Sequence, residues 1–283
     1  MKLKKLIAVA LTAVMTMSLT ACGGGNTTGT TSGGAVDDGK TYNIGICQLV
    51  QHEALDAATK GFKDALTEKL GDKVKFDEQN AQGDSPTCAT IVNSFVSENV
   101  DLILANATGP LQAAASGTTD IPILGTSVTD YGTALDIKNW TGTTGINVSG
   151  TSDLAPLDQQ AAMIKELFPD KKKVGLLYCS AEANSLYQVE TIKGYLEKDG
   201  YTCTNYSFVD SNDIASVVSN AAKNSEVIYV PTDNTAASNT EVIRNTCVPA
   251  KVPVIAGEQG ICSGCGVATL SISYYDLGYT TGE

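Results

Sequence analysis

Ionisable side chains suited to binding or transforming a small molecule are few in this sequence, and most of them are carboxylates. The 283 residues include one histidine, His52, and one arginine, Arg244. Asp233 and Glu258 each follow a predicted strand, which places them at the strand ends where open α/β sheets bind ligands. A carboxylate there can accept hydrogen bonds from an ammonium group. Two alternatives stay open: Asp233 caps a helix predicted to start near Thr235, and Glu258 forms a salt bridge in a hinge or loop.

The same residue types give little support to catalysis or metal binding. A Ser-His-Asp triad would have to use His52, but the sequence has no G-x-S-x-G elbow, and no local signature marks a Cys–His pair. Cys262 and Cys265 form a C-x-x-C pair in a predicted loop, with no second pair and no histidine after it, so we expect no zinc site. A local disulfide or two free thiols are the expected states of this pair. We therefore predict no enzyme activity, no metal and no cofactor.

Composition and charge narrow the class of protein further. An apolar share of 42% and a charged share of 18% fit a chain that buries a core, so disorder throughout is excluded. The length suggests about two domains. A formal charge of −12 opposes the neutralisation of phosphates, so nucleic-acid binding is excluded as well.

The first forty residues carry targeting signals rather than a fold. Three lysines precede an apolar run at 6–21, which is shorter than the ~20 residues of a membrane-spanning helix and typical of an export signal. The run ends in Leu19-Thr20-Ala21-Cys22, which resembles the bacterial lipobox, whose cysteine is acylated and becomes the first residue after cleavage; a chance cysteine is the alternative. Residues 1–21 are then a signal peptide and residues 22–40, rich in Gly and Thr, a lipidated flexible tether. We expect the mature protein, with a formal charge of −15 once the three lysines are removed, on the outer face of the cytoplasmic membrane, held by its lipid alone.

Downstream of the tether, strand-like and helix-like segments alternate. Short β-rich runs are predicted at 42–50, 74–76, 101–105, 121–124, 174–178, 201–209 and 227–230. Helical spacing of apolar residues is found at 53–70, 85–96, 154–168, 186–198 and 214–223, with Ser85 as the N-cap of the second helix. This alternation predicts an α/β fold with parallel sheets covered by helices on both faces.

Two stretches of this pattern look like one unit used twice. Gly45 lies in a strand that is followed by a polar turn and a helix containing Lys60-Gly61-Phe62. Gly175 lies in a strand that is followed by a polar turn and a helix containing Lys193-Gly194-Tyr195. Matching positions in matching βαβ units indicate two similar lobes. Facing lobes of this type bind a ligand in the cleft between them and close by hinge motion.

Six segments also resemble a known family. They are QLVQHEALDAATKGF (48–62), NAQGD (80–84), NATGPLQAAA (106–115), SAEANS (180–185), VPTDNTAAS (230–238) and ISYYDLG (272–278). In order and without large gaps over 42–283, they are similar to the substrate-binding lipoproteins of ABC importers, and more narrowly to a subgroup described as tryptophan/tyrosine-binding. The resemblance implies a type I periplasmic-binding-protein fold with two Rossmann-like lobes, three hinge crossovers and one small ligand between them, and an ABC permease and ATPase as partners. Related proteins carry other amino acids, and the alternative function is a ligand-sensing, ectodomain-like binding protein for another small apolar solute.

An amino acid needs a partner for its carboxylate as well as for its ammonium group. The single arginine falls inside a predicted helix and faces solvent, so we expect backbone N–H groups at helix N-termini to bind the carboxylate. Thr108 and Gly109 precede one such helix, and Asn184 and Ser185 precede another. Gly109 lets a ligand approach the backbone closely. Replacing Asp233 by alanine is expected to remove amino-acid binding and to leave the fold intact.

Further polar residues complete the predicted site. Gln48 and His52 flank the turn after the first strand and are expected to hydrogen-bond the ligand or to close the lobes; a solvent-facing helix start is the alternative for His52. Glu182, in the equivalent turn of the second lobe, is a candidate contact between the lobes. The predicted ligand-binding set is Gln48, His52, Thr108, Gly109, Thr129, Ser180, Asn184, Ser185, Asp233, Asn234 and Glu258.

Energies favour a ligand with a large apolar group. Two or three charge-assisted hydrogen bonds contribute roughly 1.5–3 kcal/mol each, whereas association costs about 4–15 kcal/mol. Burial of an aromatic side chain adds about 4–6 kcal/mol, which favours an aromatic amino acid and equally allows a leucine-like one. Trp140 and Tyr131 are candidates to stack on a ring or, alternatively, aromatic residues of surface loops.

The predicted boundaries place lobe 1 at 41–148 and 268–283 and lobe 2 at 149–267, in a monomer. The chain stops at Asp276-Leu-Gly-Tyr-Thr-Thr-Gly-Glu283, where the family continues into a helix and a closing segment of lobe 1. We therefore expect lobe 1 to lack a helix that covers its sheet, which would expose an apolar face, and the third crossover to be incomplete.

Overall fold

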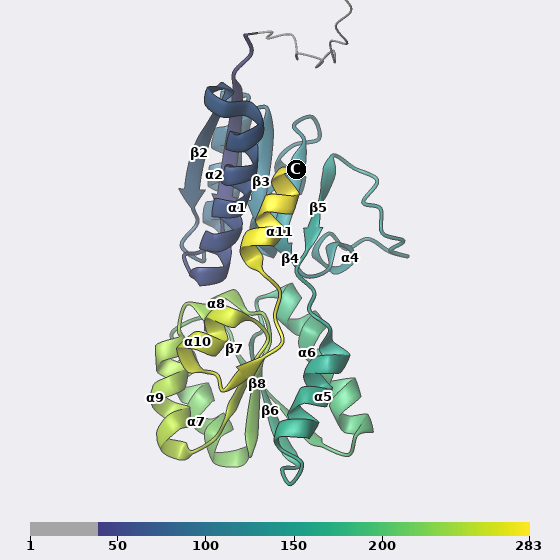
Figure 1. The fold of residues 1–283 in the computed structure, drawn as a ribbon, viewed down its shortest axis with the longest axis vertical. Helices are drawn as coiled ribbons and strands as arrows, with labels where there is room; N and C mark the ends of the chain where they lie inside the picture. Colours follow the sequence, from purple (N-terminus) through teal and green to yellow (C-terminus); the bar gives the residue numbers. More distant parts are fainter. Residues whose placement is uncertain (1–38) are drawn as a thin grey trace, which may run out of the picture. The chain divides into compact units, whose positions relative to one another are not determined.

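Two α/β lobes, each built on a five-stranded parallel sheet, make up the part of the chain that the computed structural model describes, residues 39–283 (Figure 1). The predicted fold class is confirmed by these two sheets. The predicted signal peptide, the lipidation site at Cys22 and nearly all of the tether lie outside the described residues. No helix within residues 39–283 combines the length and the apolarity needed to cross a membrane.

Lobe 1 contains the first five strands of the chain. They are β1 (Tyr42–Gln48), β2 (Val74–Asn80), β3 (Leu102–Asn106), β4 (Ile123–Val128) and β5 (Val148–Ser152), in the order β2-β1-β3-β4-β5. The helices are α1 (Glu53–Leu70), α2 (Ser85–Glu98), α3 (Thr108–Gly117), the short α4 (Tyr131–Ala134) and α11 (Tyr274–Gly282), and a 3-10 turn spans Gly71–Lys73. The central strands are apolar nearly throughout because helices cover both faces: α2 and α3 pack on one face and α1 on the other.

Lobe 2 repeats this plan. Its strands are β6 (Lys173–Cys179), β7 (Thr202–Phe208), β8 (Val227–Val230), β9 (Val254–Ala256) and β10 (Ala268–Thr269), in the order β10-β9-β8-β6-β7. Its helices are α5 (Leu157–Leu167), α6 (Ala183–Lys198), α7 (Ile214–Asn224), α8 (Asn234–Ala237), α9 (Thr240–Ala250) and α10 (Gln259–Cys265). Helices α7 and α9 cover one face of the sheet, and α5 and α6 cover the other.

The two sheets have the same topology. Counted from the first strand of each lobe, the order is 2-1-3-4-5 in both sheets, and every strand pair is parallel. The direction of winding reverses between β1 and β3 in lobe 1 and between β6 and β8 in lobe 2. Open α/β sheets bind ligands outside the carboxyl ends of the strands at such a switch point. Each lobe therefore offers one binding edge, and the internal repeat seen in the sequence extends over the whole topology.

The boundaries between the two lobes differ slightly from the predicted boundaries. β5 pairs with β4 and continues lobe 1 to Ser152, whereas the expected boundary is 148. β10 pairs with β9 and belongs to lobe 2, whereas residues from 268 onward were expected in lobe 1. The described residues cross between the lobes twice, at 153–156 and 270–273.

Helix α11 lies along α1 on lobe 1, where a covering helix was expected to be missing (Figure 1). Two glycines bring the helices together, because a Cβ at Gly61 would collide with the backbone of Tyr275 and a Cβ at Gly278 would collide with the backbone of Ala58. The glycine at the matching place in lobe 2, Gly194, has no such neighbour within 4 Å. The two repeated glycines therefore have different roles, a close helix contact in lobe 1 and none in lobe 2.

Candidate ligand-binding site

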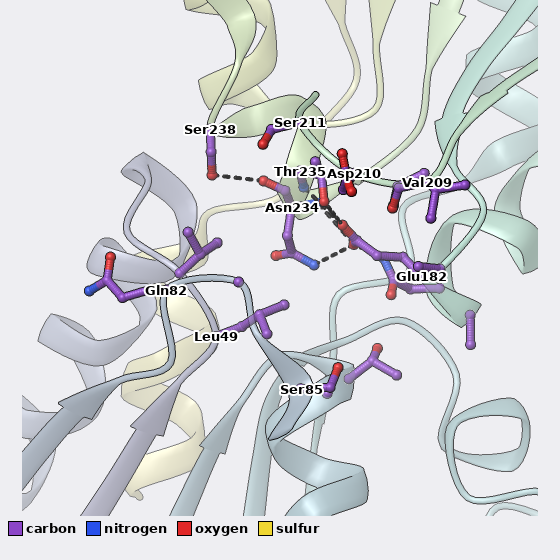
Figure 2. A pocket seen from close by; sticks show the side chains of 18 of the residues that line it. Leu49, Gln82, Ser85, Glu182, Val209, Asp210, Ser211, Asn234, Thr235 and Ser238 are labelled. Carbon is purple, nitrogen blue, oxygen red and sulfur yellow. Dashed lines mark hydrogen bonds between the residues drawn. The ribbon is translucent and has the colours of Figure 1, made fainter. Parts of the chain in front are cut away.

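A cavity of about 390 Å³ lies between the switch points of the two lobes. Its lobe 1 wall comes from the loops and helix starts after β1, β2 and β3, namely Leu49, Val50, Gln82, Gly83, Ser85, Thr108, Gly109 and Gln112. Its lobe 2 wall comes from the loops and helix starts after β6, β7 and β8, namely Cys179, Ala181, Glu182, Ala183, Asn184, Val209, Asp210, Ser211, Asn234, Thr235, Ser238 and Asn239. Figure 2 shows Leu49 and Ser85 of lobe 1 on one side of the cavity and Glu182 and Asn234 of lobe 2 on the other. The equivalent loops of the repeat thus build the two halves of one site.

Four of the predicted ligand-binding residues line this cavity: Thr108, Gly109, Asn184 and Asn234. The other seven lie outside its wall: Gln48, His52, Thr129, Ser180, Ser185, Asp233 and Glu258.

Asp233 is fully buried and caps α8. Its Oδ1 accepts a hydrogen bond from the Ala236 amide at 2.8 Å, and its Oδ2 accepts from the Cys179 amide at 2.6 Å and from the Ser185 hydroxyl at 2.7 Å. Burial raises the pKa of this carboxyl group above its ordinary value, and the charge of Glu182 raises it further. Asp233 therefore has the helix-capping role that the sequence left open as an alternative. Its bond to the Ser185 hydroxyl also accounts for the side chain of that predicted ligand-binding residue.

Glu258 is the N-cap of α10. Its carboxylate accepts from the Gly260 and Ile261 amides, at 2.6 Å to Gly260, and burial raises its pKa. The helix that it caps contains Cys262 and Cys265, which were expected in a loop. Both are free thiols.

Gln48 and Ser180 bond within their own lobes. The amide of Gln48 donates to Asp56 at 2.7 Å, and its Oε1 accepts from Thr59 at 2.6 Å, so the side chain ties the end of β1 to α1. The hydroxyl of Ser180 donates to the carbonyl of Phe208 at 3.2 Å, which ties the end of β6 to the end of β7. Both residues therefore shape the loops at the switch points without reaching the cavity.

Thr129 and the two candidate aromatic residues also lie away from the cavity. The Thr129 hydroxyl donates to the buried carboxyl group of Asp153 at 2.9 Å, at the crossover between the lobes. Tyr131 and Trp140 line a different hollow beside β5. Stacking of either ring on a ligand in the main cavity is inconsistent with this placement.

Glu182 lines the cavity but is saturated with donors from its own lobe. Its Oε1 accepts from the amide and the hydroxyl of Thr235, both at 2.8 Å. Its Oε2 accepts from the amide and the side chain of Asn234, at 3.0 and 2.7 Å, and from Asn184 at 3.1 Å. Since two carboxylate oxygens offer about four lone-pair sites, Glu182 acts as a fixed negative charge, and the contact between lobes expected of it is not among its bonds.

Asp210 is the carboxylate of the wall with acceptor capacity left open. Its Oδ1 accepts from the Asn212 amide at 2.8 Å, and no group within residues 39–283 donates to its Oδ2. Asp210 is not among the predicted ligand-binding residues, although the repeat offers a signal for it: Asp210 follows the second strand of lobe 2, as the segment NAQGD follows the second strand of lobe 1. None of the described residues in the wall is a lysine, arginine, histidine or aromatic residue. The wall is therefore acidic, with no side-chain cation.

Helix N-termini supply the positive end of the site. Five helices begin at the wall. Three of them have an acidic N-cap: Asp84 for α2, Glu182 for α6 and Asp233 for α8. The N-cap of α9 is the neutral Asn239, but this helix has Glu241 in its first turn, whereas α3 has no acidic residue there. The cap of α2 is thus one residue before the predicted Ser85. The N-cap of α3 is Ala107, whose side chain cannot accept a hydrogen bond. Because acidic caps compensate the positive end of a helix, α3 is left as the uncompensated helix start among the described residues of the wall.

The start of α3 is held in a strained turn. Ala107 alone connects β3 to α3, with φ 101° and ψ 169°, a region that residues other than glycine enter at a cost of about 1–3 kcal/mol. Pro110 has no amide hydrogen, and the Leu111 amide donates to the Ala107 carbonyl at 3.2 Å. The amides of Thr108 and Gly109 remain, and both residues line the cavity. In the described part of the chain neither amide has an acceptor, so both are free to donate to a bound anion.

Residues 43–283 match the family described as ABC transporter substrate binding protein. The chain belongs to this family. It is therefore a substrate-binding protein rather than an enzyme, as its residues predicted. Within residues 39–283, no three histidine, cysteine or acidic side chains come together as a metal site.

One curated relative of this substrate-binding protein is a tyrosine-binding protein of Clostridioides difficile strain R20291. The two sequences are 39% identical over 289 residues, which cover 100% of this chain and 83% of the relative. The resemblance to the tryptophan/tyrosine-binding subgroup is confirmed at the level of the family and of this relative.

Solved structures of similar proteins differ in how closely they match. An ABC domain in complex with L-Trp from Streptococcus pneumoniae matches with a TM-score of 0.82 at 36% identity. A ligand-free, open substrate-binding protein of Clostridium difficile matches with a TM-score of 0.60 at 38% identity. Both matches cover 86% of this chain and 83% of the other. A leucine-binding protein of Thermotoga maritima shares the fold at 14% identity and a TM-score of 0.63, in agreement with the predicted type I periplasmic-binding-protein fold.

Proposed function

We propose that this protein is an extracytoplasmic solute-binding lipoprotein of an ABC importer that captures an α-amino acid, preferably an aromatic one, between its two lobes. The observation that carries the proposal is the division of charge in the cavity. Lobe 1 presents the uncompensated start of α3, and lobe 2 presents two carboxylates. A zwitterion matches this division, with its negative end toward lobe 1 and its positive end toward lobe 2.

The carboxylate of the ligand binds to the amides of Thr108 and Gly109. These groups are oriented outward by a helix of ten residues, whose dipole favours an anion at this end. The start of α6 also lines the cavity, but the charge of Glu182 at its N-cap opposes an anion there. Since the wall lacks a side-chain cation, the main chain supplies the donors.

The ammonium group of the ligand binds to Asp210. Its free Oδ2 can accept a charge-assisted hydrogen bond, worth roughly 1.5–3 kcal/mol, and the fixed charge of Glu182 stabilises a cation in the same half of the cavity. The sequence-based choice for this role was Asp233, whose oxygens are occupied by donors from lobe 2.

The side chain of the ligand packs against the apolar part of the wall. Leu49 and Val50 contribute from lobe 1 and Ala181 and Val209 from lobe 2. Burial of an aromatic side chain between such groups adds about 4–6 kcal/mol. The names of the relatives, tyrosine-binding and in complex with L-Trp, support the same preference.

The lipid anchor rests on Cys22 and its lipobox. An acylated Cys22 would hold the folded lobes at the outer face of the cytoplasmic membrane, where a monomer delivers its ligand to an ABC permease driven by an ATPase. Labelled palmitate should enter the full chain and not the variant Cys22→Ser; equal labelling of the two proteins would overturn the anchor.

A thermal-shift screen of the full chain against the twenty L-amino acids tests the ligand. At a free ligand concentration of 100 Kd, binding stabilises the protein by about 2.7 kcal/mol, which raises the midpoint by roughly 5–11 °C for a chain of this size. L-tyrosine or L-tryptophan should give the largest rise. Tyramine, which lacks the carboxylate, and 3-(4-hydroxyphenyl)propionate, which lacks the ammonium group, should each give a smaller rise than L-tyrosine.

Two results would contradict the proposal at different levels. If the aromatic amino acids leave the midpoint unmoved while another amino acid raises it, the aromatic preference fails and the zwitterion site stands. If no amino acid raises it, the assignment of amino-acid binding fails.

A further inference from the structure

His52 makes a hydrogen bond from one lobe to the other. It is the N-cap residue of α1 in lobe 1, but its ring does not cap the helix. Its Nε2 instead lies 3.1 Å from Oδ1 of Asn234, the first residue of α8 in lobe 2. Asn234 also lines the ligand cavity. The contact therefore spans the two lobes at the edge of the ligand cavity.

The partners of Asn234 fix which atom carries the proton. Its Nδ2 donates to the Glu182 carboxylate at 2.7 Å, and since a carboxylate only accepts, the amide cannot be flipped. Oδ1 therefore faces His52 as an acceptor, and the ring donates through Nε2–H. The other nitrogen, Nδ1, is buried and has no partner among the described residues. His52 is thus a neutral donor whose second nitrogen has no acceptor for an added proton.

The arrangement of the lobes resembles a liganded relative more than an open one. At equal coverage and similar identity, the TM-score is 0.82 to the structure in complex with L-Trp and 0.60 to the ligand-free, open structure. Near His52, the Ser263 hydroxyl of lobe 2 also donates to Glu53 of lobe 1 at 3.1 Å. These contacts therefore belong to the closed arrangement.

We propose that His52 is a positioning residue that latches the lobes shut: its Nε2–H bond to Asn234 stabilises the closed form around the bound solute. This inference rests on the proposed function, because closure serves to retain a ligand. A bond present only in the closed form raises the apparent affinity by its own equilibrium factor, without any contact to the ligand. For one neutral hydrogen bond this factor is about two- to tenfold.

The contribution of the latch to closure is expected to decrease as the pH falls. In the closed form burial lowers the pKa of His52, and this effect exceeds the opposing influence of Asn234 and of the carboxylates that face the ring, which are Glu53 and Asp56 of α1 and Glu182 of lobe 2. In the open form the ring returns to water, with an ordinary pKa of about 6.5. Above that pH the ring is neutral in both forms and the latch contributes fully. As the pH falls through about 6.5, the open form takes up a proton that the closed form rejects, so closure and affinity decline.

Three forms of the full chain test the latch: wild type, His52→Gln and His52→Ala. Glutamine places an amide donor near the position of Nε2 and does not titrate, whereas alanine removes the donor. Calorimetric titration with L-tyrosine and L-tryptophan at pH 7.5 should give an affinity for His52→Gln close to that of wild type. For His52→Ala it should give an affinity about two- to tenfold lower. Between pH 7.5 and 5.5 the affinity of wild type should fall more than that of His52→Gln.

The outcomes separate the latch from the proposed function. Equal affinities of His52→Ala and wild type, or identical pH profiles of His52→Gln and wild type, would overturn the latch. If wild type binds neither amino acid, the proposed ligand fails, and small-angle X-ray scattering without ligand tests the latch by itself. The radius of gyration of wild type should then rise between pH 7.5 and 5.5 more than that of His52→Gln; an equal response of the two would overturn the latch.

Discussion

Replacing Asp233 by alanine distinguishes a capping carboxylate from a ligand-binding one. The substitution leaves the Cys179 and Ala236 amides and the Ser185 hydroxyl without their acceptor in the interior of lobe 2. Loss of an N-cap costs about 1 kcal/mol, and each buried donor left unsatisfied costs about 1–3 kcal/mol. Removing a desolvated carboxylate offsets part of this cost. We expect the free energy of unfolding to fall by about 2–4 kcal/mol.

The assay is thermal unfolding of the full chain followed by circular dichroism. For a chain of this size the expected loss lowers the midpoint by roughly 5–15 °C. Asp84→Ala is the matched control, because Asp84 is also an N-cap aspartate that accepts from an amide, at 2.9 Å from Thr87, but it is exposed. Its midpoint should fall by about 2–4 °C.

One combination of results would contradict the capping role of Asp233. If Asp233→Ala melts within about 2 °C of wild type and has lost binding of L-tyrosine, the carboxylate contacts the ligand and its three donors find other partners. That result would restore the role that the sequence suggested for Asp233.

Two further predictions address the ligand and the helix contact of lobe 1. Asp210→Asn should weaken L-tyrosine binding about 10- to 100-fold, whereas the exposed Asp213→Asn, three residues along and outside the cavity, should leave it unchanged in calorimetric titration; equal affinities of the two variants would exclude Asp210 as the ammonium partner. Gly61→Ala should lower the thermal midpoint, because the new methyl group forces α1 and α11 apart at a cost of about 1–3 kcal/mol. Gly194→Ala, at the matching place in lobe 2, should raise the midpoint, because alanine stabilises a helix by up to about 1 kcal/mol relative to glycine. A midpoint of Gly61→Ala at or above that of wild type would contradict the close contact.

The local sequence pattern was sufficient to predict most of the helices and strands. The helix at 53–70 and the strand at 227–230 have the bounds that apolar spacing predicted, because these signals are contained in the segments themselves. The cap of α2 was misplaced by one residue since Asp84 and Ser85 are both good caps and a proline fits the first or second helical position. A covering helix was expected to be missing from lobe 1, because the resemblance placed it after the end of the sequence; α11, within residues 274–282, instead packs on α1.

The ligand-binding residues were harder to predict than the fold, because the sequence around a carboxylate does not show which groups donate hydrogen bonds to it. Asp233 and Asp210 each follow a strand, and both positions open toward the cavity side of lobe 2. What separates them is that Cys179 and Ser185, about 50 residues before Asp233, supply donors to it, and such long-range partners have no local signature. Thr108 and Gly109, whose amides were predicted to bind the ligand carboxylate, do line the cavity, and glycine and proline mark their helix start directly in the sequence.

The pairing of α1 with α11 has a consequence for how the chain folds. The two helices belong to one lobe but are separated by roughly 200 residues, and closing so long a loop carries a large entropic cost before its contacts form. Lobe 2 is contiguous from α5 to β10, so none of its contacts requires the closure of so long a loop. The core of lobe 2 can therefore form before α11 (Tyr274–Gly282) packs against α1 on lobe 1.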